Sequence, residues 1–145
     1  MPSMKPENCQ AEQPLLCALA ETKHPNPKSY MKKLRVLMNK DDNRKLADAH
    51  RDIFLGKVDG QQTQLPKDSR LGCRMINQYL PMLTTEGGGV KQEDIDFLKD
   101  IFEDDGYPLV TRAQAQWARV RMLANLQRMK DMQSAAQAGL DLVAG

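Results

Sequence analysis

The side chains with the widest chemical range in this chain are three cysteines and two histidines. The cysteines, Cys9, Cys17 and Cys73, are odd in number and have no CxxC spacing. The histidines, His24 and His50, do not stand in a motif with any of them. A structural zinc site needs about four such ligands at characteristic spacings, so we expect no metal site. Cys17 lies among apolar neighbours, which indicates a small buried side chain and not an activated nucleophile.

The motifs of phosphate-binding loops and of hydrolases are missing. The glycine-rich stretch at residues 87–91, GGGVK, lacks the GxxxxGK[ST] spacing, and no predicted strand precedes it. The chain has no GxSxG or HExxH motif, and two histidines leave little for acid–base catalysis. We therefore expect a protein with no enzymatic activity and no cofactor.

Clustered basic residues are the strongest functional signal. Residues 23–57 carry ten Lys and Arg against four Asp and Glu. Such a cluster either contacts the phosphates of a nucleic acid or forms a solvated helical face. Two helices with a short turn resemble a helix-turn-helix in outline only, because the turn lacks glycine and Asp41 and Asp42 would repel phosphate. The candidate nucleic-acid-binding residues are Lys28, Lys32, Lys33, Arg35, Lys40, Arg44, Lys45 and Arg51.

The acidic residues concentrate further along the chain. Residues 93–105 hold seven Asp and Glu against Lys99. An EF-hand loop would need a glycine and a glutamate at fixed positions that this stretch lacks, and its apolar spacing predicts a helix. These acids either pair with the basic residues at 112–130 or face a basic partner. Asp96 and Asp100 are candidate partner contacts.

Composition bounds the class of protein. The 145 residues are 41% hydrophobic and 28% charged, typical of one globular domain with or without a helical appendage. The longest apolar run, residues 15–20, is too short to span a bilayer. The first residues include no apolar leader and the cysteines form no disulfide framework, so we expect a cytoplasmic protein without membrane contact.

Apolar residues recur at helical spacing through most of the chain, and no segment alternates as a strand would. The sequence therefore predicts an all-α fold. Asn26 and Pro27 are typical of a helix start. Asp41 and Asp42 either end that helix or cap the start of the next one, and Gly56 is typical of a helix stop. Pro81 is expected to kink or end its helix. The predicted helices span residues 11–23, 27–40, 42–55, 67–83, 91–105 and 112–136, and the last ends either there or at 143.

The last predicted helix, capped by Thr111, has apolar residues on two faces and an abundance of methionine. One face can pack on the acidic helix as a hairpin. The other needs the N-terminal unit or a second subunit. Its large side chains either fill the core or form an adaptable interface. The candidate interface residues are Trp117, Val120, Met122, Leu126, Met129 and Met132, with Asp96 and Asp100 on the acidic helix.

These features divide the chain into a flexible arm at 1–9, a basic helical unit at 10–84, a glycine hinge at 85–90 and a helical hairpin at 91–145. This layout resembles that of phage small terminase subunits, which bind DNA and assemble as rings. We expect a nucleic-acid-binding accessory or regulatory protein, of phage or mobile-element type, that self-associates through its last helix. The alternative is a helical inhibitor or adaptor that binds another protein through its acidic face or its methionine-rich helix.

Overall fold

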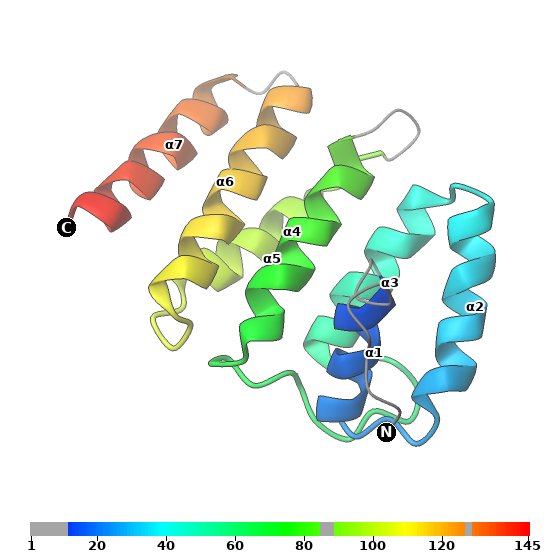
Figure 1. Ribbon diagram of the computed structural model, residues 1–145. Coiled ribbons are helices and arrows are strands. Elements are labelled where there is room, and N and C mark those ends of the chain that lie inside the picture. Colours follow the sequence, from blue (N-terminus) through cyan, green and yellow to red (C-terminus); the bar gives the residue numbers. More distant parts are fainter. Residues whose placement is uncertain (1–11, 85–88, 127–128) are drawn as a thin grey trace.

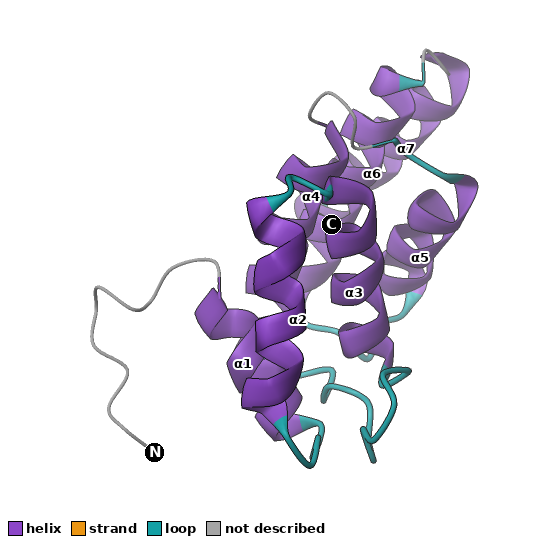
Figure 2. Ribbon diagram, turned by 90° about the vertical axis from the view of Figure 1, so that its right-hand side faces the viewer, coloured by secondary structure: helices purple, strands orange, loops and turns teal. Residues whose placement is uncertain are grey.

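A computed structural model of the chain describes residues 12–84, 89–126 and 129–145, with only the backbone described at 12, 13, 129, 130 and 132. These residues form helices without strands, which confirms the predicted all-α fold (Figures 1 and 2). The helices are α1 (Glu12–Glu21), α2 (Pro27–Asn39), α3 (Asn43–Leu55), α4 (Arg70–Thr84), α5 (Gln92–Glu103), α6 (Leu109–Asn125) and α7 (Met129–Ala144). None of them is both long and apolar enough to cross a membrane.

The predicted boundaries of α2 and α3 are confirmed by their caps. The Asn26 side chain accepts a hydrogen bond from the Ser29 amide at 3.2 Å, and Pro27 opens α2. The Asp42 side chain accepts a hydrogen bond from the Lys45 amide at 3.2 Å and caps the start of α3. Gly56 ends α3 with φ of 72°, a left-handed conformation that glycine adopts without a steric penalty.

Two helix ends differ from those predicted. Of the two alternatives for Pro81, a kink or a helix end, the helix end is wrong, since α4 continues to Thr84. Pro81 has no amide hydrogen to donate to the Asn77 carbonyl, four residues earlier. Both residues are exposed, so water can donate a hydrogen bond to that carbonyl instead. Thr111 does not cap the following helix either. That helix starts at Leu109, and Thr111 is buried within its first turn.

The prediction of a single long last helix was also wrong. The chain forms two helices, α6 and α7, which pack side by side (Figure 1). Gln116 of α6 donates a hydrogen bond to the Ala135 carbonyl of α7, and Gly139, which has no Cβ, lets α7 approach the Gln116 side chain closely. Residues 120–128 have good helix propensity, but propensity is a weak preference that tertiary packing overrides. The second apolar face predicted for this helix is therefore covered only in part: Leu123 is buried, Val120 is half-buried and Trp117 is exposed.

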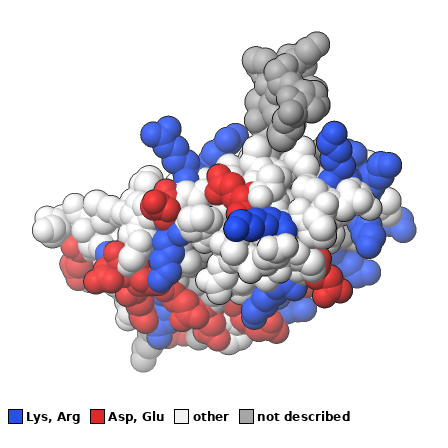
Figure 3. Space-filling model, turned by 90° about the horizontal axis from the view of Figure 1, so that it is seen from below, with Lys and Arg blue, Asp and Glu red and all other residues white. Residues whose placement is uncertain are grey.

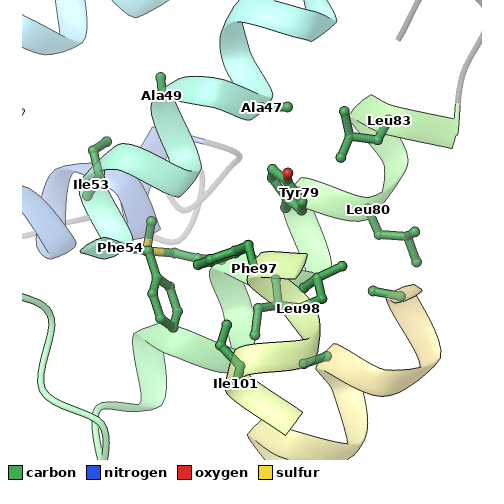
Figure 4. Packing of buried hydrophobic residues seen from close by; sticks show 14 of the residues in the cluster. Ala47, Ala49, Ile53, Phe54, Tyr79, Leu80, Leu83, Phe97, Leu98 and Ile101 are labelled. Atoms are coloured by element: carbon green, nitrogen blue, oxygen red, sulfur yellow. The ribbon is translucent and has the colours of Figure 1, made fainter. Parts of the chain in front are cut away.

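Buried apolar side chains from α1 through α7 form one cluster. Phe97 belongs to it and lies edge-on to Phe54 at 5.3 Å between ring centroids and to Tyr79 at 5.9 Å (Figure 4). Aromatic rings prefer this edge-to-face geometry. The cluster thus joins α3 and α4 to α5, across the predicted hinge. Residues 85–88 and the predicted arm at 1–9 lie outside the described residues, so the hinge and the arm remain predictions.

Candidate nucleic-acid interface

The exposed side of α2 is the most basic surface of the described chain. Met31 and Leu34 point into the core, because they recur at the spacing that places residues on one side of a helix. Tyr30, Leu37 and Met38 are half-buried against the same core, the opposite side of the helix faces outward, and α2 contains no acidic residue. Five of the eight predicted phosphate contacts are exposed on α2 or at its C-cap: Lys28, Lys32, Lys33, Arg35 and Lys40.

We call these five residues the α2 basic face. In the described part of the chain, no carboxylate lies within ion-pair distance of its four lysines. Lys45 adds a sixth exposed cation at the start of α3, with Asp42 at 3.9 Å. Figure 3 shows Lys and Arg gathered at the right, where α2 lies, and Asp and Glu towards the lower left. The charge separation in the sequence is therefore also a separation in space.

The other two predicted phosphate contacts, Arg44 and Arg51 on α3, lie elsewhere. Both bind Asp94 of α5, which is completely buried. Arg44 places Nη1 at 2.7 Å and Nη2 at 2.9 Å from the two carboxylate oxygens, and Arg51 places Nη1 at 2.9 Å. Asp48 supports both guanidinium groups from within α3, at 2.7 and 3.2 Å. These two arginines join α3 to α5, so their charges are already paired within the chain.

Asp94 is held as a charged group by its neighbours. Burial alone would raise its pKa, but hydrogen bonds from Arg44, from the Tyr79 hydroxyl and from the Lys91 amide at 2.8 Å hold that pKa below its ordinary value. The same carboxylate raises the pKa of Arg44 through the hydrogen bond, and burial and the bond to Asp94 raise that of Tyr79. We call Asp94, Arg44, Arg51 and Tyr79 the Asp94 network.

Asp94 was not singled out in the sequence, although a signal was present. It precedes Leu98 by four residues and Ile101 by seven, so it lies on the buried apolar side of α5. A carboxylate on such a face requires cationic or hydrogen-bonding partners, because burying an unpaired charge is very costly. Those partners are 43 and 50 residues away in sequence, which the pattern alone does not identify.

The predicted partner interface is divided by the structure. Met122 is completely buried, so it belongs to the core. Trp117 and Leu126 are exposed at the surface of the α6–α7 hairpin, and Val120 is half-buried. The side chains of Met129 and Met132 lie outside the described residues. Asp96 and Asp100 are exposed on α5, as a partner contact requires.

The residues considered for metal or nucleophilic chemistry are apart from these surfaces. His50 is buried, and its Nδ1 lies 2.8 Å from the Leu46 carbonyl oxygen. Burial lowers its pKa, which keeps the ring neutral at pH 7. Cys17 and Cys73 are half-buried free thiols, and burial raises the pKa of Cys73. Among the described residues, no three metal-ligating side chains come together.

Comparison with known proteins gives no relative: no family model, curated protein or solved structure matches the chain.

Proposed function

We propose that this protein is a non-enzymatic nucleic-acid-binding accessory or regulatory protein that contacts phosphates through the α2 basic face. The observation that carries the proposal is that this helix presents five exposed cations and no acid, and that its lysines have no ion-pair partner in the described chain. Phosphate contacts require cations that are free to replace the condensed counterions of a nucleic acid.

The geometry favours backbone contact over base readout. Lys28, Lys32 and Arg35 follow one another at four and three residues, so they form one row along the helix. Lys33 and Lys40 form a second row, seven residues apart. From Lys28 to Lys40 the rows extend about 18 Å along the axis, which is several phosphate spacings of a duplex strand. The α2 face carries no exposed aromatic ring for stacking on single strands.

The experiment uses a labelled duplex of random sequence and measures binding by fluorescence anisotropy across a salt series. The test variant, the α2 pair, carries Lys32→Gln and Lys33→Gln. The matched control, the α5 pair, carries Asp96→Asn and Asp100→Asn, which also removes two exposed charges. The slope of log affinity against log salt should fall by roughly 0.9 for each lost contact in the α2 pair.

The α5 pair should bind equally well or slightly more tightly, because it removes negative charge. Wild-type protein that binds neither DNA nor RNA at low salt would contradict the proposal. A slope that is the same in wild type and the α2 pair would place the contacts elsewhere.

A second candidate function is binding to another protein through the α6–α7 hairpin. Seven large apolar side chains are exposed in the described chain, and only one of them, Val36, lies outside this hairpin. Exposed large apolar side chains are typical of protein interaction sites where they form one patch. The six on the hairpin are Leu109, Val110, Trp117, Leu126, Leu140 and Val143. Under this alternative, Trp117→Ser would abolish binding of the partner protein, and the α2 pair would bind that partner as well as the wild type does.

A further inference from the structure

An open groove of about 330 Å³ lies between α3 and α5, on the acidic side of the molecule. Its lining includes apolar side chains from α3, from α5 and from the turn after α5. Phe97 and Ile101 are buried beneath it, and Leu55 and Tyr107 are half-buried at its margin. An apolar side chain placed here would leave water and contact these four residues. We call this feature the α3–α5 groove.

Carboxylates line the α5 side of the groove: Glu93, Asp96, Asp100 and Asp104. They recur at three- and four-residue steps, so they form one row of about 16 Å along the helix. Asp104 is bound by Lys67 at 2.6 Å, and Glu93 lies 3.5 Å from Arg51. Within the described ranges, no Lys or Arg lies at ion-pair distance from Asp96 or Asp100. The cations of the lining, Arg51 and Lys57, lie on α3 and just after it, so the groove suits an apolar side chain with cations on its α5 side.

The α2 basic face has this chemistry. Val36 is 50% exposed and is the one large apolar side chain among the outward residues of α2. It lies four residues from both Lys32 and Lys40, so the three follow one another along the same side of the helix. Asp96 and Asp100 are also four residues apart, which gives the two helices the same spacing of opposite charges.

We propose that the α2 basic face of one copy docks into the α3–α5 groove of a second copy. Val36 enters the groove, and Lys32 and its neighbours pair with Asp96 and Asp100. The two surfaces differ, so the association is head-to-tail, and each complex keeps one free surface of each kind. The pairing charges are exposed, which makes the association weak and dependent on salt. The proposal does not require nucleic-acid binding, although a bound nucleic acid would compete for the same helix.

The first measurement is the mass of the full chain by sedimentation equilibrium, over a concentration series in low salt and in about 0.5 M salt, where the Debye length is only several ångströms. We expect a mass above the single-chain value of 16.4 kDa that rises with concentration in low salt. In high salt the mass should fall to one chain. A single-chain mass at all concentrations in low salt would overturn the proposal.

The decisive measurement uses the two variant pairs. The α2 pair retains only an intact groove, and the α5 pair retains only an intact α2 basic face. Each variant alone should have the mass of one chain, since neither can form the contact with itself. Mixed in equal amounts, they should form a complex of two chains that does not grow further, because only one productive interface exists between them. Circular dichroism should show that both variants keep the wild-type helix content.

The remaining outcomes identify the other possible occupants. Association that persists in high salt and in both variants, but is lost in Trp117→Ser, would overturn the proposal in favour of contact through the α6–α7 hairpin. Variants that stay single when mixed would also overturn it. The same variants distinguish this proposal from duplex binding. The α5 pair should lose self-association but keep its affinity for nucleic acid, so either property can be absent without the other.

Discussion

Arginines on α3 and lysines on α2 are neighbours in sequence but have opposite surroundings. Arg44 and Arg51 are largely buried and are bound to Asp94 at 2.7 to 2.9 Å. Lys32 and Lys33 are exposed, with no carboxylate of the described chain at ion-pair distance. The first pair is used to hold two helices together. The second contributes little to stability and is available for a partner.

The comparison shows that the number of charges in a segment does not measure its capacity to bind. The ten cations of residues 23–57 are of at least two kinds, and only the fold separates them. Asp94, on the buried side of α5, binds both arginines of α3, so both arginines are structural. The following predictions test this division, beginning with the largest effect.

Asp94→Ala should lower the free energy of unfolding by about 3–5 kcal/mol, because it leaves the guanidinium groups of Arg44 and Arg51 without their buried counter-charge. Urea denaturation followed by circular dichroism measures the change. Asp96→Ala, two residues away on the exposed side of α5, is the matched control and should change stability by less than about 0.5 kcal/mol. Equal effects of the two substitutions would show that the Asp94 network does not hold α3 to α5.

Tyr79→Phe should cost about 1.5–3 kcal/mol, because it removes a hydrogen bond to a buried charged acceptor while keeping the ring beside Phe97. Tyr107→Phe removes a hydroxyl from a half-buried ring outside the network. It should be nearly neutral in the same urea experiment. A neutral Tyr79→Phe would mean that the Tyr79 hydroxyl does not support Asp94.

His50 should make stability depend on pH. Its pKa in the folded protein is lowered by burial, so below the ordinary value of about 6.5 the unfolded chain binds a proton that the folded chain does not. The contribution of neutral His50 to the free energy of unfolding is fully present above pH 6.5. Below that pH it falls by up to about 1.4 kcal/mol per pH unit. Urea denaturation at pH 7.5 and 5.5 measures the loss. His50→Leu should flatten it, and an unchanged dependence in that variant would assign the titration to another group.

The α2 pair should change the free energy of unfolding by less than about 0.5 kcal/mol, since its two lysines are exposed and unpaired in the described chain. Thermal melting and urea denaturation check this directly. A loss of more than about 1 kcal/mol would show that Lys32 or Lys33 is part of the fold, and the contrast with Arg44 and Arg51 would disappear.

Local features of the fold could be predicted from the sequence, because their physical cause is local. Asn26 and Asp42 cap helices through the amides three residues later, and Gly56 ends α3 by adopting a positive φ. The apolar stripe of α2 likewise places its lysines outside without reference to any other element.

Features that depend on contacts distant in sequence could not be predicted. The position of Arg44 is decided by Asp94, 50 residues later. The division of the last helix into α6 and α7 depends on packing between Gln116 and Ala135, which competes with a continuous run of good helix formers. Met122 is in the core, while Trp117 and Leu126 stay exposed, so the residues predicted as one interface have different surroundings. Self-association through that surface stays a prediction.

The most direct test of the central claim is to map the amide signals of the labelled protein by two-dimensional NMR while a duplex of random sequence is added at low salt. We expect the largest shifts at the exposed positions of α2, from Lys28 to Lys40, and at Lys45 beside them. Arg44, Arg51 and the exposed side of α5 should change little, because the arginines are bound to Asp94 and the acids repel phosphate. Shifts centred on α5 or on the α6–α7 hairpin, or no shifts at all, would contradict it.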